Sequence, residues 1–139
     1  DARWNMMMAS TEGAMAFSKG LGAVHSMSHA LGANEELQLH HGTLNAVLLP
    51  TILRFNRDHV GDKYSRISRA MGQKGEIDLA EEIEILNAKI GLPSGLKEMG
   101  VKEDMIPELV LHSISDPSNA TTPRLPNQRE WENLFMESM

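Results

Sequence analysis

Apolar residues recur every three or four positions along most of this chain, which is the spacing of an amphipathic α-helix. The clearest example is a stripe formed by Leu79, Ile83, Leu86 and Ile90. Asp78 stands just before this stripe, where a carboxylate can cap a helix, and Gly91 follows it, where glycine commonly ends one. The pattern therefore predicts a helix over 79–90 with these four side chains buried.

The same spacing predicts further helices throughout the chain. Their expected ranges are 2–17, 23–31, 43–56, 64–71 and 103–115, with a single turn over 94–99 and a last helix capped by Asn127. The stretch 116–126 is rich in proline, serine, asparagine and threonine, so it is expected to be a loop. No stretch alternates apolar and polar residues over a useful length, so no strand is predicted. The expected fold class is all-α, a bundle of six to seven helices.

Two of these helices have distinctive compositions. The range 43–56 is apolar on nearly all sides, so it is predicted to be the central buried helix, with a kink at Pro50. The range 2–17 is rich in methionine, which usually indicates an adaptable face that packs into a core.

Length, charge and cysteine content narrow the possible functions. The 139 residues fit a single domain, and the net charge of −6 argues against nucleic acid or an anionic membrane surface as a partner. No apolar run reaches the ~20 residues that span a bilayer, and no signal-peptide pattern is found. Because cysteine is absent, disulfides and thiolate ligands are excluded, and we expect a reducing, cytoplasmic setting. The chain begins with a helical pattern at Asp-Ala-Arg-Trp, so we expect it to be a piece of a longer protein.

Four of the six histidines fall within seventeen positions. His25 and His29 are four residues apart, so their rings share one face of a helix, and His40 and His41 follow a polar loop. Neutral imidazoles are common ligands of divalent transition metals. His41 is the preferred ligand over His40, because it directly precedes Gly42 and the start of the buried helix. The spacing alone is a weak signal, and hydrogen-bonded structural histidines are the alternative.

The segments around these histidines resemble those of a known family. They read Ala14-Met-Ala-Phe-Ser-Lys-Gly-Leu-Gly-Ala-Val-His-Ser-Met-Ser-His-Ala-Leu-Gly32, His40-His-Gly-Thr-Leu-Asn-Ala-Val-Leu-Leu-Pro50 and Leu53-Arg-Phe-Asn56. They closely resemble the iron-containing (group III) alcohol dehydrogenases, most densely over 10–72. The resemblance implies that residues 1–139 are the helical, metal-binding C-terminal domain of the dehydroquinate synthase-like fold. It also implies that an N-terminal nucleotide-binding domain is absent from this chain.

The resemblance implies roles for individual residues. In that family one aspartate and three histidines hold a divalent metal, usually Fe2+, with Zn2+ or Mn2+ as alternatives. Matched by motif, His25 and His41 are two of these ligands. His29 is implied to line the site beside nicotinamide and substrate, where it either relays the alcohol proton or makes a structural hydrogen bond. Phe17 is implied to pack against the nicotinamide and substrate cleft.

Two features of the family are missing from the sequence, and two hypotheses follow. The missing features are an upstream Asp-x-x-x-His ligand pair and the Gly-Gly-Gly-Ser loop that binds the pyrophosphate of NAD(P). The first hypothesis is the metal-binding half of an NAD(P)-dependent enzyme that interconverts an alcohol and an aldehyde or ketone by metal-assisted hydride transfer, inactive on its own. The second is a stand-alone helical module that binds metal or a partner without catalysis. If the first hypothesis holds, the partner of this chain is the N-terminal nucleotide-binding domain. An apolar face that this domain would cover is then exposed, which predicts homo-oligomerisation.

Overall fold

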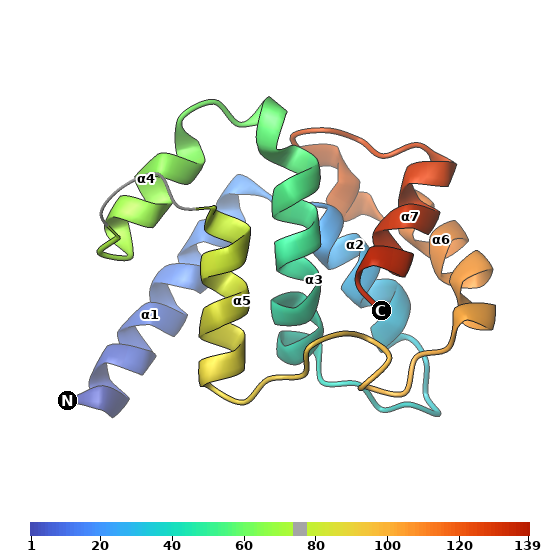
Figure 1. The fold of residues 1–139 in the computed structure, drawn as a ribbon, viewed down its shortest axis with the longest axis horizontal. Coiled ribbons are helices and arrows are strands. Elements are labelled where there is room, and N and C mark those ends of the chain that lie inside the picture. The colour runs from blue at the N-terminus through green and yellow to red at the C-terminus, as the bar shows by residue number, and fades with distance from the viewer. Residues whose placement is uncertain (74–77) are drawn as a thin grey trace.

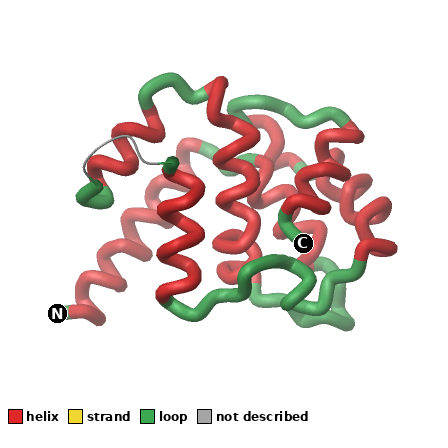
Figure 2. Tube along the Cα trace, in the orientation of Figure 1, coloured by secondary structure: helices red, strands yellow, loops and turns green. Residues whose placement is uncertain are grey.

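The computed structural model describes residues 1–73 and 78–139, and all regular structure within these ranges is helical (Figures 1 and 2). The α-helices are α1 (Ala2–Ala16), α2 (Ala23–Gly32), α3 (His41–Asn56), α4 (Lys63–Ala70), α5 (Leu79–Lys89), α6 (Ile106–Ser115) and α7 (Gln128–Glu137). The all-α prediction and the expected number of helices are therefore confirmed for the described residues. None of these helices combines the length and hydropathy needed to cross a bilayer.

Helix α3 lies at the centre of the described part of the chain. It packs against α2 and α5, while α2 also packs against α6, and α6 against α7 (Figure 1). The helix begins two residues earlier than predicted, because the His40 side chain accepts a hydrogen bond from the Thr43 backbone N–H at 3.3 Å and so caps it. The fully buried large side chains of the core are Met27, Leu31, Leu44, Leu48, Leu96, Trp131 and Phe135.

Local signals in the sequence placed several helix ends correctly. Asp78 accepts a hydrogen bond from the Ala80 backbone N–H at 3.0 Å at the start of α5. Asn127 and Glu130 each accept a hydrogen bond from the other's backbone N–H at the start of α7, which is a capping box. The predicted loop 116–126 contains a short 3-10 helix, η4 (Pro117–Thr121). Residues 94–99 form turns rather than a turn of helix.

Two predicted core faces are largely exposed, so those predictions were wrong for most of their residues. Of the four side chains in the predicted stripe only Leu79 is buried, Ile83 is half-buried, and Leu86 and Ile90 are 42% and 61% exposed. Helix α1 has no buried residue, and its Trp4 and Met6 are 65% and 69% exposed. An apolar stripe is buried only if another element covers it, and α1 extends away from the other helices toward the N-terminus (Figure 1). The sequence pattern cannot show whether such a covering element is part of the chain.

Candidate metal centre

Three imidazole rings meet where α2 lies against the start of α3. The centroid of the His41 ring is 5.4 Å from those of His25 and His29, which are themselves 5.7 Å apart. His25 and His29 project from α2 one turn apart, and His41 opens α3. The structure therefore brings together the three histidines that the sequence selected. His40 instead caps the start of α3, and its ring Nδ1 is 3.1 Å from the Thr43 hydroxyl.

The helix η4 is fixed against this centre by a glycine and an asparagine. Gly20 has a φ of 96°, and a Cβ at this position would overlap the side chain of Thr121. Only glycine adopts this backbone conformation without cost, and only glycine leaves room for the threonine. Asn119 then joins two helices, since it accepts a hydrogen bond from Ser26 of α2 at 2.7 Å and donates one to the Ser113 carbonyl of α6 at 2.7 Å.

This arrangement places the carboxylate of Asp116 against His29. Asp116 Oδ2 is 2.9 Å from His29 Nδ1, and Oδ1 accepts the Ser118 backbone N–H at 2.8 Å. Burial raises the pKa of the Asp116 carboxyl, but hydrogen bonds from Ser118 and His29 outweigh burial and hold that pKa below its usual value. The ionised carboxylate favours a proton on His29 Nδ1, and in the neutral ring this tautomer leaves the lone pair on Nε2.

Asp116 is a site residue that sequence reasoning missed. It lies 87 positions from His29, at the start of a segment predicted only as a loop. Its one local signal is the Asp-Pro-Ser sequence, which is typical of an aspartate that caps a short helix. That signal explains the hydrogen bond to Ser118 but says nothing of a distant imidazole.

His25 is held in its neutral form. Burial lowers the pKa of the His25 imidazole, and charge on His41 or His29 lowers it further, against a smaller opposing effect of Asp116. A neutral imidazole is the form that ligates metals. The ring of Phe17 meets His25 edge-on, with centroids 5.7 Å apart, and the Phe17 side chain remains 59% exposed. Phe17 thus flanks the centre on an open side, and its contact with a nicotinamide stays a prediction.

Two of the imidazoles direct Nε2 toward one point. The side-chain amide nitrogen of Asn45 is 3.1 Å from His41 Nε2 and 3.4 Å from His25 Nε2. The ring of His29 is instead stacked on His41, with an interplanar angle of 15°, and is tied to Asp116. Within the described residues no three His, Cys, Asp or Glu side chains are placed to hold one metal. The donor set therefore fits two imidazole ligands of a divalent cation, fewer than the three or four protein ligands such a site normally has.

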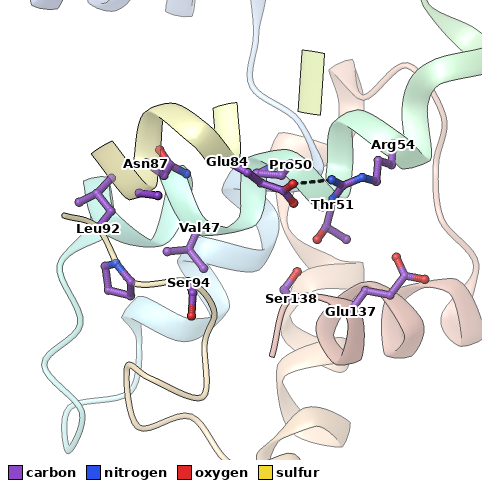
Figure 3. Close-up of a pocket in the computed structure, with 12 residues that line it drawn as sticks. Val47, Pro50, Thr51, Arg54, Glu84, Asn87, Leu92, Ser94, Glu137 and Ser138 are labelled. Atoms are coloured by element: carbon purple, nitrogen blue, oxygen red, sulfur yellow. Dashed lines mark hydrogen bonds and ion pairs between the residues drawn. The ribbon is translucent and has the colours of Figure 1, made fainter. Parts of the chain in front are cut away.

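Helix α3 lines several cavities, and one of them adjoins the histidines. A largely apolar cavity of about 380 Å³ lies between α2, α3 and residues 122–123, with His25, Asn45 and Asn56 among its walls. A second cavity, of about 340 Å³, lies between α3, α5 and the end of α7 (Figure 3). Arg54 and Glu84 form an ion pair of 2.7 Å in its wall, and no histidine lines it. The second cavity is therefore not part of the metal centre.

Comparison with known proteins assigns the chain to a family. The profile of the Fe-containing alcohol dehydrogenase family, C-terminal, matches residues 1–139. The chain belongs to this family. It is 43% identical over 146 residues to 4-hydroxybutyrate dehydrogenase of Cupriavidus necator, covering 100% of this chain and 38% of that protein. It is 38% identical over 133 residues to lactaldehyde reductase of Escherichia coli K12, covering 89% of this chain and 34% of that protein.

The fold agrees with a solved member of the same type. The crystal structure of 1,3-propanediol oxidoreductase superposes with a TM-score of 0.78 at 33% identity, over 86% of this chain and 33% of that one. The expected family and the expected C-terminal helical fold are both confirmed. The chain spans about a third of the length of the relatives that it matches.

Proposed function

We propose that this chain is the metal-binding half of an iron-type, NAD(P)-dependent alcohol dehydrogenase that interconverts an alcohol and an aldehyde or ketone. The observation that carries the proposal is the convergence of His25 Nε2 and His41 Nε2 on one point, in a chain that matches the family's C-terminal profile. The relatives are dehydrogenases and reductases of hydroxylated substrates, which supports hydride transfer as the reaction class.

In this proposal His25 and His41 hold a divalent cation, Fe2+ as in the family, with Zn2+ or Mn2+ as alternatives. When bound, such a cation polarises the substrate oxygen and stabilises negative charge on it during hydride transfer. The lowered pKa of His25 supports its part, because the ring stays unprotonated at neutral pH. Neutral imidazole suits all three metals, so the donor type does not distinguish among them.

His29 is proposed to receive the alcohol proton at Nε2 during oxidation and to return it during reduction. Its hydrogen bond of 2.9 Å to Asp116 supports this role, because a carboxylate at Nδ1 orients the ring and stabilises the positive charge that the transfer creates. The half-exposed His29 ring also leaves room for a substrate, since its side chain is 42% exposed. Phe17 is proposed to pack against the nicotinamide from the same open side.

The remaining metal ligands and the dinucleotide site are assigned to an N-terminal nucleotide-binding domain, so the isolated chain is proposed to be inactive. The exposed apolar side chains of α1 support a missing partner, because a helix without any buried residue gains little stability where it lies. A stand-alone module that binds metal or a partner is the second candidate, and it uses the same histidines without hydride transfer. Homo-oligomerisation and a cytoplasmic location stay predictions.

Calorimetric titration of the metal-free chain with Zn2+ tests the metal site, using protein that carries no histidine tag. We expect weak binding to one site, loss of binding in His41→Ala, and unchanged binding in His40→Ala, its matched neighbour outside the ring cluster. Loss of binding in His40→Ala alone contradicts the proposed ligand. Tight stoichiometric binding contradicts the assignment of the remaining ligands to another domain. Turnover of NADH and an aldehyde by the isolated chain contradicts its proposed inactivity.

A further inference from the structure

The side chain of Asn45 lies between the two proposed ligands. Asn45 follows His41 by four residues on α3, so the two side chains share one face of the helix. Its amide nitrogen is 3.1 Å from His41 Nε2 and 3.4 Å from His25 Nε2. An amide NH2 carries two hydrogens, so it can donate to both rings at once. Each ring must then present a lone pair at Nε2 and keep its own proton on Nδ1.

A second residue favours the same tautomer of His41 from the opposite side of the ring. The Ser28 hydroxyl is fully buried, donates its hydrogen to the His25 carbonyl at 3.1 Å, and lies 3.5 Å from His41 Nδ1. Because that hydrogen is already used, the hydroxyl presents only lone pairs to His41. Nδ1 of His41 is therefore the nitrogen that carries the proton.

If the Asn45 amide were flipped, so that its oxygen faced the rings, fewer polar groups would have a hydrogen-bond partner. With its oxygen toward the rings, both imidazoles would need a proton on Nε2, and His41 Nδ1 would face a serine oxygen with no hydrogen to give. The amide nitrogen would then occupy the buried position of Oδ1, which has no hydrogen-bond partner among the described residues. Two orphaned donor hydrogens cost more than one orphaned acceptor, so the orientation with nitrogen toward the rings is favoured.

We infer that Asn45, supported by Ser28, is a positioning residue that holds His25 and His41 in the tautomer with free Nε2 lone pairs facing one point. The two donors of the proposed cation site are then aligned before a cation arrives. That this alignment serves to bind a cation rests on the proposed function. The tautomer itself is a property of the chain without metal and can be measured separately.

Long-range 1H–15N correlation spectra of the metal-free, 15N-histidine-labelled chain at pH 8 report which ring nitrogen is protonated, well above the usual histidine pKa of about 6.5. We expect His25 and His41 to carry the proton on Nδ1, with Nε2 at the shift of an unprotonated nitrogen. Asn45→Asp keeps the size of the side chain but can only accept, so Nε2 of both rings should gain a proton. Asn87→Asp changes another half-buried amide, which bonds the Ala46 carbonyl rather than a ring, and should leave both signatures unchanged.

A proton on Nε2 of His41 in the unaltered chain would overturn the inference, as would identical ring signatures in Asn45→Asp. If Asn45→Asp does not fold, Asn45→Leu replaces it and should give a mixture of tautomers, whereas an unchanged single tautomer counts against the inference. Adding Zn2+ to the same samples separates the two proposals. If both rings show the expected tautomer but their signals do not change when Zn2+ is added, the role of Asn45 is upheld and the proposed metal site is contradicted.

Discussion

Replacing Asp116 should destabilise the chain by an amount that the structure allows us to work out. Its carboxylate is only 14% exposed, accepts a charge-assisted hydrogen bond from His29 at 2.9 Å, and caps η4 through Ser118 at 2.8 Å. Asp116→Ala removes both interactions, at about 1 kcal/mol for the cap and about 1 kcal/mol for the hydrogen bond to a half-exposed imidazole. Asp116→Asn keeps the cap and leaves at most a neutral hydrogen bond to His29 in place of the charge-assisted one, so it should cost at most about 1 kcal/mol.

Urea unfolding followed by helical circular dichroism measures this cost. With a slope of about 2 kcal/mol per molar urea, the midpoint should fall by about 1 M in Asp116→Ala and by at most about half as much in Asp116→Asn. Asp104→Ala provides the control, because Asp104 is exposed. Equal midpoints for Asp116→Ala and Asp104→Ala would refute the reasoning, since they would mean that the carboxylate holds neither His29 nor η4.

Three further predictions concern other parts of the chain. Gly20→Ala should lower the free energy of unfolding by more than about 1 kcal/mol, because a φ of 96° and the side chain of Thr121 both exclude a Cβ. Gly13→Ala is the control, because the space at Gly13 is open, and equal urea midpoints for the two variants would contradict this prediction. The hydrogen bond from Arg57 lowers the pKa of Asp78, so the ionised carboxylate stabilises the folded chain at neutral pH, and this stability is lost as pH falls below about 4. The free energy of unfolding of Asp78→Asn should therefore fall less over that pH range, and a pH dependence equal to that of the unaltered chain would count against the ion pair. Met6→Lys combined with Met7→Lys should reduce self-association in sedimentation velocity, and an unchanged distribution would mean that α1 is not the contact surface.

The sequence predicted those parts of the fold whose causes are local. The cap at Asp78 and the capping box of Asn127 depend on residues two or three positions away, so the ends of α5 and α7 could be predicted. Burial depends on a partner, which explains why Ile90 was placed in the core although it is 61% exposed. The same reason applies to α1, whose methionines suggest a core face while no described element covers them.

The candidate site shows the same division. His25 and His41 could be selected from their spacing and from the resemblance, because both lie in contiguous motifs. Asp116 could not, since its contact with His29 bridges 87 positions and depends on how η4 packs between α2 and α6. Asn45 gave no signal either, because one amide in an apolar helix suggests a structural hydrogen bond, and only the positions of both rings show what it touches.

The claim that His25 and His41 share one cation is tested most directly by proton NMR of the chain loaded with paramagnetic Co2+. We predict two sets of hyperfine-shifted imidazole signals, and we expect both sets to be lost in His25→Ala and in His41→Ala, because one ring alone binds the cation too weakly to hold it. Shifted signals that persist in both variants, or that disappear instead in His40→Ala, would contradict the account.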